Sequence, residues 1–292
     1  MPVDHEIDSR NKNIQIYING SFYHRDEAKI SVYDSGFLMG DGIWEGLRLV
    51  NNKWIFIEEH IDRLFEGCKA IDLDIKMTKE DIVNALDETK AINNMSNEVH
   101  ARLMITRGNK LKPFQQPHLS ESGINIVIIM EHSKPSIDVK NITMATVPQV
   151  RGMPMSQDPK LNSHSKLNCI LACIQANKLG ADEALMLDPL GFVNTTNSCN
   201  FFIVKNNQVW TSTGDYCMNG VTRQNIINLC KENDIPIYEK NFSLVDVYSA
   251  DEAFITGTLG SLTNVTSIDN RNIGKDNNPI SDKLRNYYKK LL

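Results

Sequence analysis

The chain has 292 residues, of which 41% are hydrophobic, with a formal net charge of −5 and a pI near 5.8. This length favours two domains, and the apolar content is sufficient to fill their cores. The acidic balance argues against a nucleic-acid surface, where clustered basic charge is expected. No stretch approaches the ~20 apolar residues that span a bilayer, and the acidic N-terminal sequence lacks an apolar targeting segment. We therefore expect a cytoplasmic protein that binds neither nucleic acid nor membrane.

The first part of the chain combines helix and strand patterns. Period-2 alternation or short apolar runs predict strands at 14–18, 29–33, 99–106 and 124–130, the last of them buried on both faces. Helical spacing of apolar residues predicts helices at 58–73 and 78–95. The second helix carries a capping signal, because Thr78 is followed three residues later by Asp81. An α+β domain over residues 1–131 follows from these elements.

The polar, proline-bearing segment 132–141 is the predicted interdomain linker. In the second domain, 142–292, the same patterns predict helices at 166–178 and from 221 onward, and strands at 184–187, 201–204, 209–210, 235–238, 252–256 and 264–268. The fold class is therefore α/β (α+β), with a smaller N-terminal and a larger C-terminal domain.

The six cysteines lie mostly in apolar-periodic segments and form no Cys-x-x-Cys pair. We interpret them as reduced core residues. Cys169 and Cys173 would share a helical face, but zinc needs two further ligands at suitable spacing. No metal site is predicted.

Lys166 is the first candidate for chemistry. It lies where a polar turn enters a predicted helix, and a lysine in such a place can lose its proton and attack a carbonyl. Most lysines are solvated surface charges, so position alone does not establish this role.

Two stretches of small residues could bind an anion. Gly220 precedes Val221, Thr222 and a predicted helix, whose first backbone N–H groups would be unpaired. The same sequence also fits an ordinary capped helix. A second small-residue loop, 257–261, follows a predicted strand. In contrast, the glycines of 40–46 lack the spacing of a dinucleotide-binding loop and lead into a strand, which excludes a Rossmann site.

Ordered motifs from about residue 15 to 270 resemble the class IV aminotransferases, the pyridoxal-phosphate enzymes of fold type IV. The motifs are 33–48 (YDSGFLMGDGIWEGLR), 60–64 (HIDRL), 101–108 (ARLMITRG), 191–202 (GFVNTTNSCNFF), 220–223 (GVTR) and 257–258 (GT). Similarity to branched-chain and D-amino-acid aminotransferases and to aminodeoxychorismate lyase implies two domains, a homodimer, and pyridoxal 5'-phosphate held between the domains.

The resemblance also implies roles for individual residues. Lys166 would form the covalent bond to the cofactor. The residues implied to bind the cofactor phosphate are Arg63, Val221, Thr222 and Thr258. Met39, Trp44 and Leu259 would line the substrate side, where ordinary core packing is the alternative. Arg102, Arg107 and Lys112 are unranked candidates to bind a substrate carboxylate.

The sequence departs from the family pattern at two positions. In ungapped register the family lysine falls on Asn162, while Lys166 lies one helical turn later and Lys160 two residues earlier. We choose Lys166, because Lys160 follows Asp158-Pro159 and is expected in an exposed turn. The family glutamate that pairs with the pyridine nitrogen falls on Thr195, and a hydroxyl cannot hold a pyridinium by charge.

These features predict a transaminase that moves an amino group between an amino acid or amine and a 2-oxo acid, with branched-chain-like substrates favoured. Thr195 would weaken the cofactor ring as an electron sink, and a fold fixes the cofactor more firmly than the reaction. A lyase or racemase resembling aminodeoxychorismate lyase, and a non-catalytic pyridoxal-phosphate-binding protein, are the alternatives.

Overall fold

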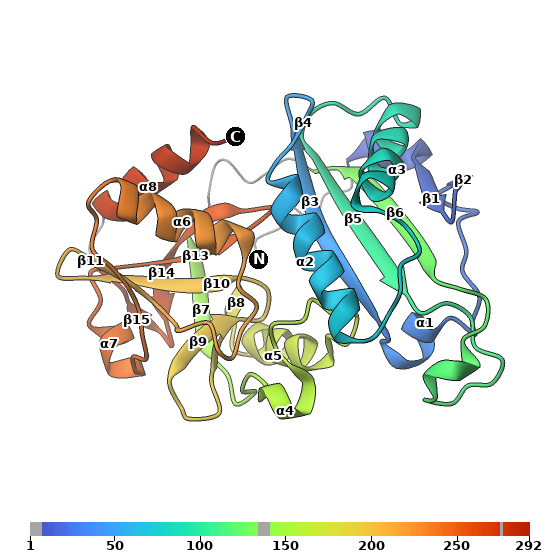
Figure 1. The fold of residues 1–292 in the computed structure, drawn as a ribbon. Coiled ribbons are helices and arrows are strands. Elements are labelled where there is room, and N and C mark those ends of the chain that lie inside the picture. The colour runs from blue at the N-terminus through green and yellow to red at the C-terminus, as the bar shows by residue number, and fades with distance from the viewer. Residues whose placement is uncertain (1–7, 134–140, 275–276) are drawn as a thin grey trace. The chain divides into compact units, whose positions relative to one another are not determined.

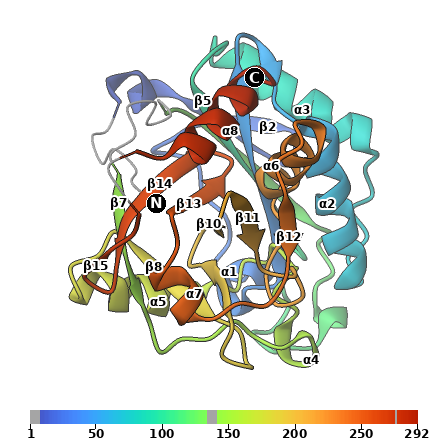
Figure 2. The same cartoon turned by 90° about the vertical axis from the view of Figure 1, so that its left-hand side faces the viewer.

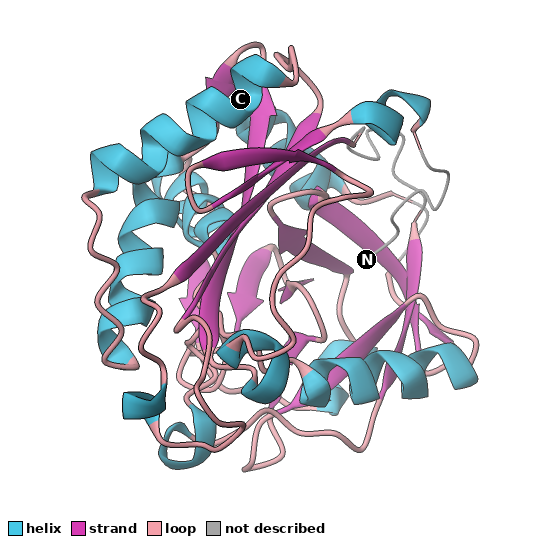
Figure 3. Ribbon diagram, turned by 90° about the vertical axis from the view of Figure 1, so that its right-hand side faces the viewer, coloured by secondary structure: helices cyan, strands magenta, loops and turns pink. Residues whose placement is uncertain are grey.

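The computed structural model describes residues 8–133, 141–274 and 277–292. The chain divides into two compact units. The N-terminal unit comprises His5–Lys134 together with Asn162–Lys166, and the C-terminal unit includes Pro135–Leu161 and Leu167–Leu292. Each unit contains one sheet with helices packed on it (Figures 1 and 3).

The N-terminal unit is built on a six-stranded sheet with strand order β2-β1-β6-β5-β3-β4. Its strands are β1 (Gln15–Ile18), β2 (Ser21–His24), β3 (Gly42–Val50), β4 (Lys53–Trp54), β5 (Val99–Thr106) and β6 (Asn125–His132). Its helices are η1 (Ser9–Asn13), α1 (Ser35–Met39), α2 (Ile57–Ala70), α3 (Lys79–Ile92) and η2 (Pro117–Leu119). Helix α2 packs along β3, and α3 packs on β1 and β6 (Figure 1).

Local sequence explains the helices that cover this sheet. Thr78 and Asp81 form the predicted capping box at the start of α3, and the apolar face of α2 buries Ile61, Leu64 and Cys68. The close approach of α2 to β3 requires Gly67, whose Cβ would lie 3.1 Å from a side-chain carbon of Ile43. The helix therefore holds the side chains of its inner face against the strand.

The C-terminal unit has a nine-stranded sheet with strand order β12-β11-β10-β13-β14-β7-β8-β9, with β15 paired to β14. Its strands are β7 (Ile142–Thr146), β8 (Glu183–Leu187), β9 (Val193–Thr196), β10 (Asn200–Lys205), β11 (Gln208–Thr211), β12 (Ile237–Glu239), β13 (Glu252–Gly257), β14 (Ser261–Ile268) and β15 (Arg271–Asn272). Because Asn200 of β10 pairs with Thr195 of β9, the strands from β10 through β14 and β7 to β9 close into a ring.

The described residues of the C-terminal unit form the helices α4 (Pro154–Gln157), α5 (Leu167–Lys178), α6 (Val221–Glu232), α7 (Leu244–Tyr248) and α8 (Pro279–Lys289). Helix α5 packs on β7 and β8, while α6 and α8 pack on each other and on β13 (Figure 2). The core on the inner side of this sheet includes Phe201, Ile203, Ile255 and Val265. Phe202 and Phe254 stack with ring centroids 4.9 Å apart.

Most predicted elements are confirmed, and the exceptions have physical causes. The strand predicted at 29–33 is wrong, because Ile30, Val32 and Tyr33 are exposed and the segment forms no strand. The prediction that 124–130 is buried on both faces is also wrong, since Val127 and Ile129 are only half-buried. Strand β6 extends into the predicted linker as far as His132, and residues 134–140 of that linker lie outside the described residues. The domain boundary stays a prediction.

Candidate functional site

Lys166 ends a short extended segment, Asn162–Lys166, that pairs with the edge of β3. The Trp44 backbone N–H donates to the Asn162 carbonyl at 3.0 Å, and the His164 backbone N–H donates to the Gly42 carbonyl at 2.9 Å. Helix α5 begins at the next residue after the segment. The segment therefore has a fixed register against β3.

Two glycines allow this segment to approach so closely. Gly40 has φ +70°, and a Cβ there would lie 2.4 Å from the Ser165 hydroxyl oxygen. A Cβ on Gly42 would lie 2.9 Å from the His164 ring. A Cβ on Gly42 would also lie 2.5 Å from the Ile105 carbonyl oxygen of β5, so a side chain at either position would force a local shift. Gly40 and Gly42, which lack the spacing of a dinucleotide-binding loop, make room for the segment Asn162–Lys166.

Lys166, Trp44 and Arg102 lie together on one face of the N-terminal sheet. The Lys166 Nζ is 5.5 Å from the centroid of the Trp44 ring, and the Arg102 guanidinium carbon is 3.8 Å from the same ring. Lys166 is half-buried. Arg102 and Trp44 are diagonal neighbours across the β3–β5 pairing. The structure thus brings together three of the residues that the sequence predicted as site residues.

Arg102 is suited to bind a carboxylate. Burial lowers the pKa of Arg102, and its guanidinium forms no ion pair with the described residues, where its contact is the Trp44 ring. A partly desolvated cation gains most from an incoming anion when it has no carboxylate of its own. The other candidates differ from it in their surroundings.

Arg107 donates to both carboxylate oxygens of Asp41, at 2.8 and 3.1 Å, and to the carbonyl of Ile71 at 2.8 Å. Its charge is therefore already balanced. Lys112 is exposed on a loop, and the Met39 side chain is exposed at the end of α1. The geometry ranks Arg102 first among the three basic candidates.

Arg63 belongs to a buried ion-paired cluster. Its Nε and Nη2 donate to the two carboxylate oxygens of Glu45 at 2.8 and 2.7 Å, and His60 Nδ1 lies 2.7 Å from the same carboxylate. Burial alone would raise the pKa of Glu45, but the hydrogen bonds from Arg63 and His60 outweigh it and lower that pKa. A phosphate bound by Arg63 would have to share the guanidinium with Glu45. The role of Arg63 in phosphate binding therefore stays a prediction.

In the C-terminal unit, neutral polar groups line up across three strands. Asn200 of β10 pairs with Thr195 of β9 on one side and with Thr256 of β13 on the other. The Thr195 hydroxyl donates its single proton to the Cys199 carbonyl at 2.7 Å. Among the described residues, the buried Thr256 hydroxyl has no hydrogen-bond partner. Thr195 therefore offers an acceptor to a ligand, and Thr256 offers an unused hydroxyl.

The N-terminus of α6 lies beside this row of polar residues. Its N-cap is Gly220, which makes no side-chain cap, and a Cβ on Gly220 would lie 2.4 Å from the Asn200 side-chain oxygen. Val221 and Thr222 begin the helix, and their backbone N–H groups are among those that a helix leaves unpaired. Thr222 is buried, with its hydroxyl 3.5 Å from the Tyr288 hydroxyl.

The loop that follows Thr256 contains the remaining predicted residues. Thr258 and Leu259 are half-buried there, directly after β13. The helix N-terminus and the unused Thr256 hydroxyl offer neutral hydrogen-bond donors of the kind that bind a phosphate. The cofactor-binding roles of Thr195, Val221, Thr222 and Thr258 stay predictions.

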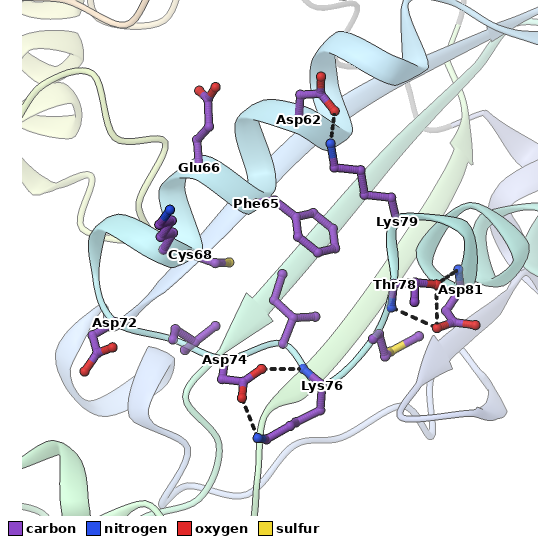
Figure 4. Close-up of a pocket in the computed structure, with 14 residues that line it drawn as sticks. Asp62, Phe65, Glu66, Cys68, Asp72, Asp74, Lys76, Thr78, Lys79 and Asp81 are labelled. Carbon is purple, nitrogen blue, oxygen red and sulfur yellow. Dashed lines mark hydrogen bonds and ion pairs between the residues drawn. The ribbon is translucent and has the colours of Figure 1, made fainter.

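A separate pocket of about 770 Å³ lies between α2 and the loop that leads into α3 (Figure 4). Some of its charged side chains are paired locally, as in the 2.6 Å contact between Lys79 and Asp62 and the ion pair of Lys76 with Asp74. None of the predicted site residues lines it. Within the described ranges, no group of three or more His, Cys, Asp or Glu side chains could hold a metal ion.

Three residues with unused polar atoms were not predicted from sequence. Among the described residues, Asn162 Oδ1, His164 Nε2 and the Thr256 hydroxyl are buried without partners. The register of the family lysine with Asn162 was the one sequence signal for the first of these. A threonine inside an apolar strand gives no such signal. Lys160, in contrast, is exposed, as expected for a turn residue.

Comparison with known proteins supports the resemblance. The family model described as amino-transferase class IV matches residues 42–268. The chain is 36% identical, over 96% of its length and 51% of the relative, to branched-chain-amino-acid aminotransferase-like protein 2 of Arabidopsis thaliana. It therefore spans about half the length of that relative. It is 37% identical to a putative branched-chain-amino-acid aminotransferase of Methanocaldococcus jannaschii, over 95% of this chain and 96% of the other.

A solved structure agrees with these relatives. The branched-chain aminotransferase of the thermophilic archaeon Thermoproteus uzoniensis, determined with norvaline, superimposes with a TM-score of 0.87 and 26% identity, over 95% of this chain and 94% of the other. The mixed helix and strand fold of this chain is that of the fold type IV enzymes. The chain belongs to the class IV aminotransferase family.

Proposed function

We propose that the protein is a pyridoxal-phosphate-dependent aminotransferase that exchanges an amino group between an amino acid and a 2-oxo acid. The observation that carries this proposal is the grouping of the Lys166 amine with Trp44 and Arg102. A nucleophilic amine beside a cation without a carboxylate partner suits a substrate that has both an amino group and a carboxylate. Family membership supports the same reaction class.

The residues present fit pyridoxal phosphate. In the C-terminal unit, the unpaired N–H groups of α6 and the Thr256 hydroxyl would hold its phosphate, with Thr258 contributing from its loop. In the N-terminal unit, Lys166 would hold its aldehyde end. When bound, the cofactor supplies a carbonyl for the amino group and a conjugated ring that withdraws electrons from the reacting carbon.

Lys166 would then move a proton. Its Nζ must be unprotonated to accept the proton from the substrate α-carbon, and it would deliver that proton to the cofactor carbon that carries the nitrogen, acting first as base and then as acid. The Lys166 amine and the Arg102 guanidinium both lie over the same Trp44 ring, which places the amine beside the group that would bind the substrate carboxylate. Half-burial of Lys166 limits the access of water to the amine.

Arg102 would bind the substrate carboxylate, and the Trp44 ring would contact an apolar side chain, which favours branched-chain-like substrates. Met39 and Leu259 are proposed to complete the substrate side. The relatives' names support this preference, since one is named a branched-chain-amino-acid aminotransferase-like protein and the other a putative branched-chain-amino-acid aminotransferase.

Thr195 is proposed to face the cofactor ring nitrogen. Because its proton is committed to the Cys199 carbonyl, its oxygen can accept a hydrogen bond but cannot supply a negative charge. A weaker electron sink keeps a lyase or racemase as the second candidate function.

We further propose a cytoplasmic homodimer. Helix α5 exposes the apolar side chains of Leu167, Ile170, Leu171 and Ile174, which a second copy of the chain could cover. The six cysteines are all free, which suits a reducing compartment. Among the described helices, none is long and apolar enough to cross a membrane.

A screen of amino donors, in both L and D forms, against 2-oxoglutarate and pyruvate tests the proposal. Keto-acid formation from a branched-chain donor, dependent on added pyridoxal phosphate, is the expected result. Pyruvate release without an amino acceptor would indicate a lyase. Tight cofactor binding with no turnover of any donor would identify a binding protein instead.

A further inference from the structure

The segment Asn162–Lys166 carries two further polar side chains, Asn162 and His164, ahead of Lys166. Ser163 forms an antiparallel bridge with Ile43, so the segment is extended at this point. Side chains two residues apart in an extended chain point to the same side. Asn162 and His164 therefore share one side of the segment, opposite to that of Ser163.

Both of these side chains have an unused buried atom. Asn162 is 4% exposed, and among the described residues its Oδ1 has no hydrogen-bond partner. The same holds for His164 Nε2. Buried polar atoms are nearly always hydrogen-bonded, and each exception requires an explanation. Two exceptions on one side of the segment, next to Lys166, indicate a ligand group that donates hydrogen bonds.

The tautomer and charge of His164 agree with an acceptor role. A hydrogen bond to the backbone of Ile43 engages the ring and raises its pKa, but burial lowers the pKa more, and the net shift is downward. The neutral ring has one donor and one acceptor nitrogen, and Nε2 has no hydrogen-bond partner among the described residues. A neutral imidazole that donates through one nitrogen accepts through the other.

The surrounding charges select the form of the ligand. Arg102 and Lys166 both lower the pKa of His164, whereas Asp34 raises it. The two cations disfavour an ammonium group at this place and favour a neutral amine. A neutral amine is also the nucleophilic form of an amino group.

We propose that Asn162 Oδ1 and His164 Nε2 form an acceptor pair that binds and orients the transferred amino group beside Lys166. The inference rests on the proposed aminotransferase function. In that reaction the nitrogen leaves the donor amino acid and ends on the cofactor as pyridoxamine phosphate. The same acceptor pair can therefore contact this nitrogen in the donor amino acid and in pyridoxamine phosphate.

Binding of two cofactor analogues tests the pair without turnover. Pyridoxamine 5'-phosphate carries the amino group, and 4'-deoxypyridoxine 5'-phosphate has a methyl group in its place. Wild-type protein should bind the amine at least tenfold more tightly in calorimetry, since one hydrogen bond is worth about that factor. Asn162→Leu and His164→Phe should each reduce this ratio about tenfold and leave the affinity for the deoxy compound unchanged.

Matched variants separate the acceptor role from structural damage. Asn162→Asp and His164→Gln retain an acceptor and should retain the preference for the amine. Asn168→Leu and His118→Phe change an exposed asparagine and an exposed histidine and should leave the ratio unchanged. An unchanged ratio in Asn162→Leu and His164→Phe would overturn the acceptor pair while leaving the aminotransferase proposal intact. Failure of the wild type to bind either analogue would overturn both proposals.

Discussion

The two units carry different polar chemistry among their candidate residues. In the N-terminal unit the polar residues are mostly charged, and the Arg63–Glu45 and Arg107–Asp41 pairs balance most of that charge internally. In the C-terminal unit they are neutral hydroxyl, amide and backbone N–H groups. Among the described residues, the Arg102 guanidinium has no ion pair and the Thr256 hydroxyl has no hydrogen bond.

This difference shows how ligand-binding residues can be separated from structural ones of the same type. Arg63 and Arg102 are both arginines implied by the resemblance, but Glu45 satisfies the first and nothing described satisfies the second. Thr195 and Thr256 lie on either side of Asn200, and only Thr195 donates to a protein group. Substitutions at these matched residues should therefore have opposite consequences for stability and binding.

The largest effect is expected from Arg63→Ala. Removing the guanidinium leaves the Glu45 carboxylate buried without its bidentate partner, and breaking a buried pair in this way costs about 3–5 kcal/mol. Urea unfolding should show that loss in the free energy of unfolding. Replacing both partners, as Arg63→Met with Glu45→Gln, should recover most of it. A variant that kept wild-type stability and lost only cofactor affinity would make Arg63 a phosphate ligand and not a structural residue.

Acid should destabilise the protein through His100. Burial lowers its pKa from 6.5 to about 4, with smaller contributions from Arg102 and His60. A histidine whose pKa is lower in the folded state is protonated more readily on unfolding, so stability falls as pH drops from about 6.5 to about 4 and the loss is complete below that range. The total is at most about 3 kcal/mol.

His100→Gln should flatten the dependence of the unfolding free energy on pH between these values. The exposed His118→Gln is the matched control and should keep the wild-type slope. If His100→Gln retained that slope as well, another group would be responsible for the acid sensitivity.

Thr195→Val and Thr256→Val compare two threonines of the same row. Thr195→Val removes a hydroxyl-to-carbonyl hydrogen bond and should cost about 1 kcal/mol of stability. Thr256→Val removes a hydroxyl that has no described partner, so stability should be unchanged or higher, and cofactor affinity should fall. Thermal unfolding and cofactor titration check both. A stability loss at Thr256 as large as that at Thr195 would show that its hydroxyl is bonded within the protein.

The smallest expected effect is a difference in thiol labelling between the four buried cysteines and the two half-buried ones. Burial raises the pKa of Cys68, Cys199 and Cys230 to about 12, and the buried Cys217 is shifted in the same direction. Cys169 and Cys173 lie half-buried on α5. Native protein should therefore expose these two thiols to Ellman's reagent, and unfolded protein should expose all six. Protection of Cys169 and Cys173 at concentrations that favour the dimer would support α5 as its interface.

Much of the fold was predictable from local signals. The capping box at Thr78, the alternation of β5 and the Gly220 helix start all act within a few residues, and the structure has them where the sequence predicted. The closure of the C-terminal sheet through Asn200 and Thr195 was not predictable, because it depends on strands distant in sequence. The amphipathic helix α8 was missed although its spacing was readable.

The sequence indicated the types of residue in the candidate site better than it indicated the partner that each side chain has in the fold. Sequence implied separate roles for Lys166, Trp44 and Arg102, with Arg102 unranked among three basic candidates, and the structure brings the Lys166 and Arg102 side chains to the Trp44 ring. It could not indicate that Arg63 and Arg107 are balanced by Glu45 and Asp41, since an ion pair depends on which side chains the fold brings into contact.

Reduction with borohydride followed by peptide mapping tests the central claim most directly. Protein incubated with pyridoxal phosphate and reduced should carry the phosphopyridoxyl group on Lys166. Lys166→Ala should lose that label and about 10²–10⁴-fold in turnover, the range that a positioned acid–base group contributes. Label on the exposed Lys160, or turnover that survives in Lys166→Ala, would contradict the account.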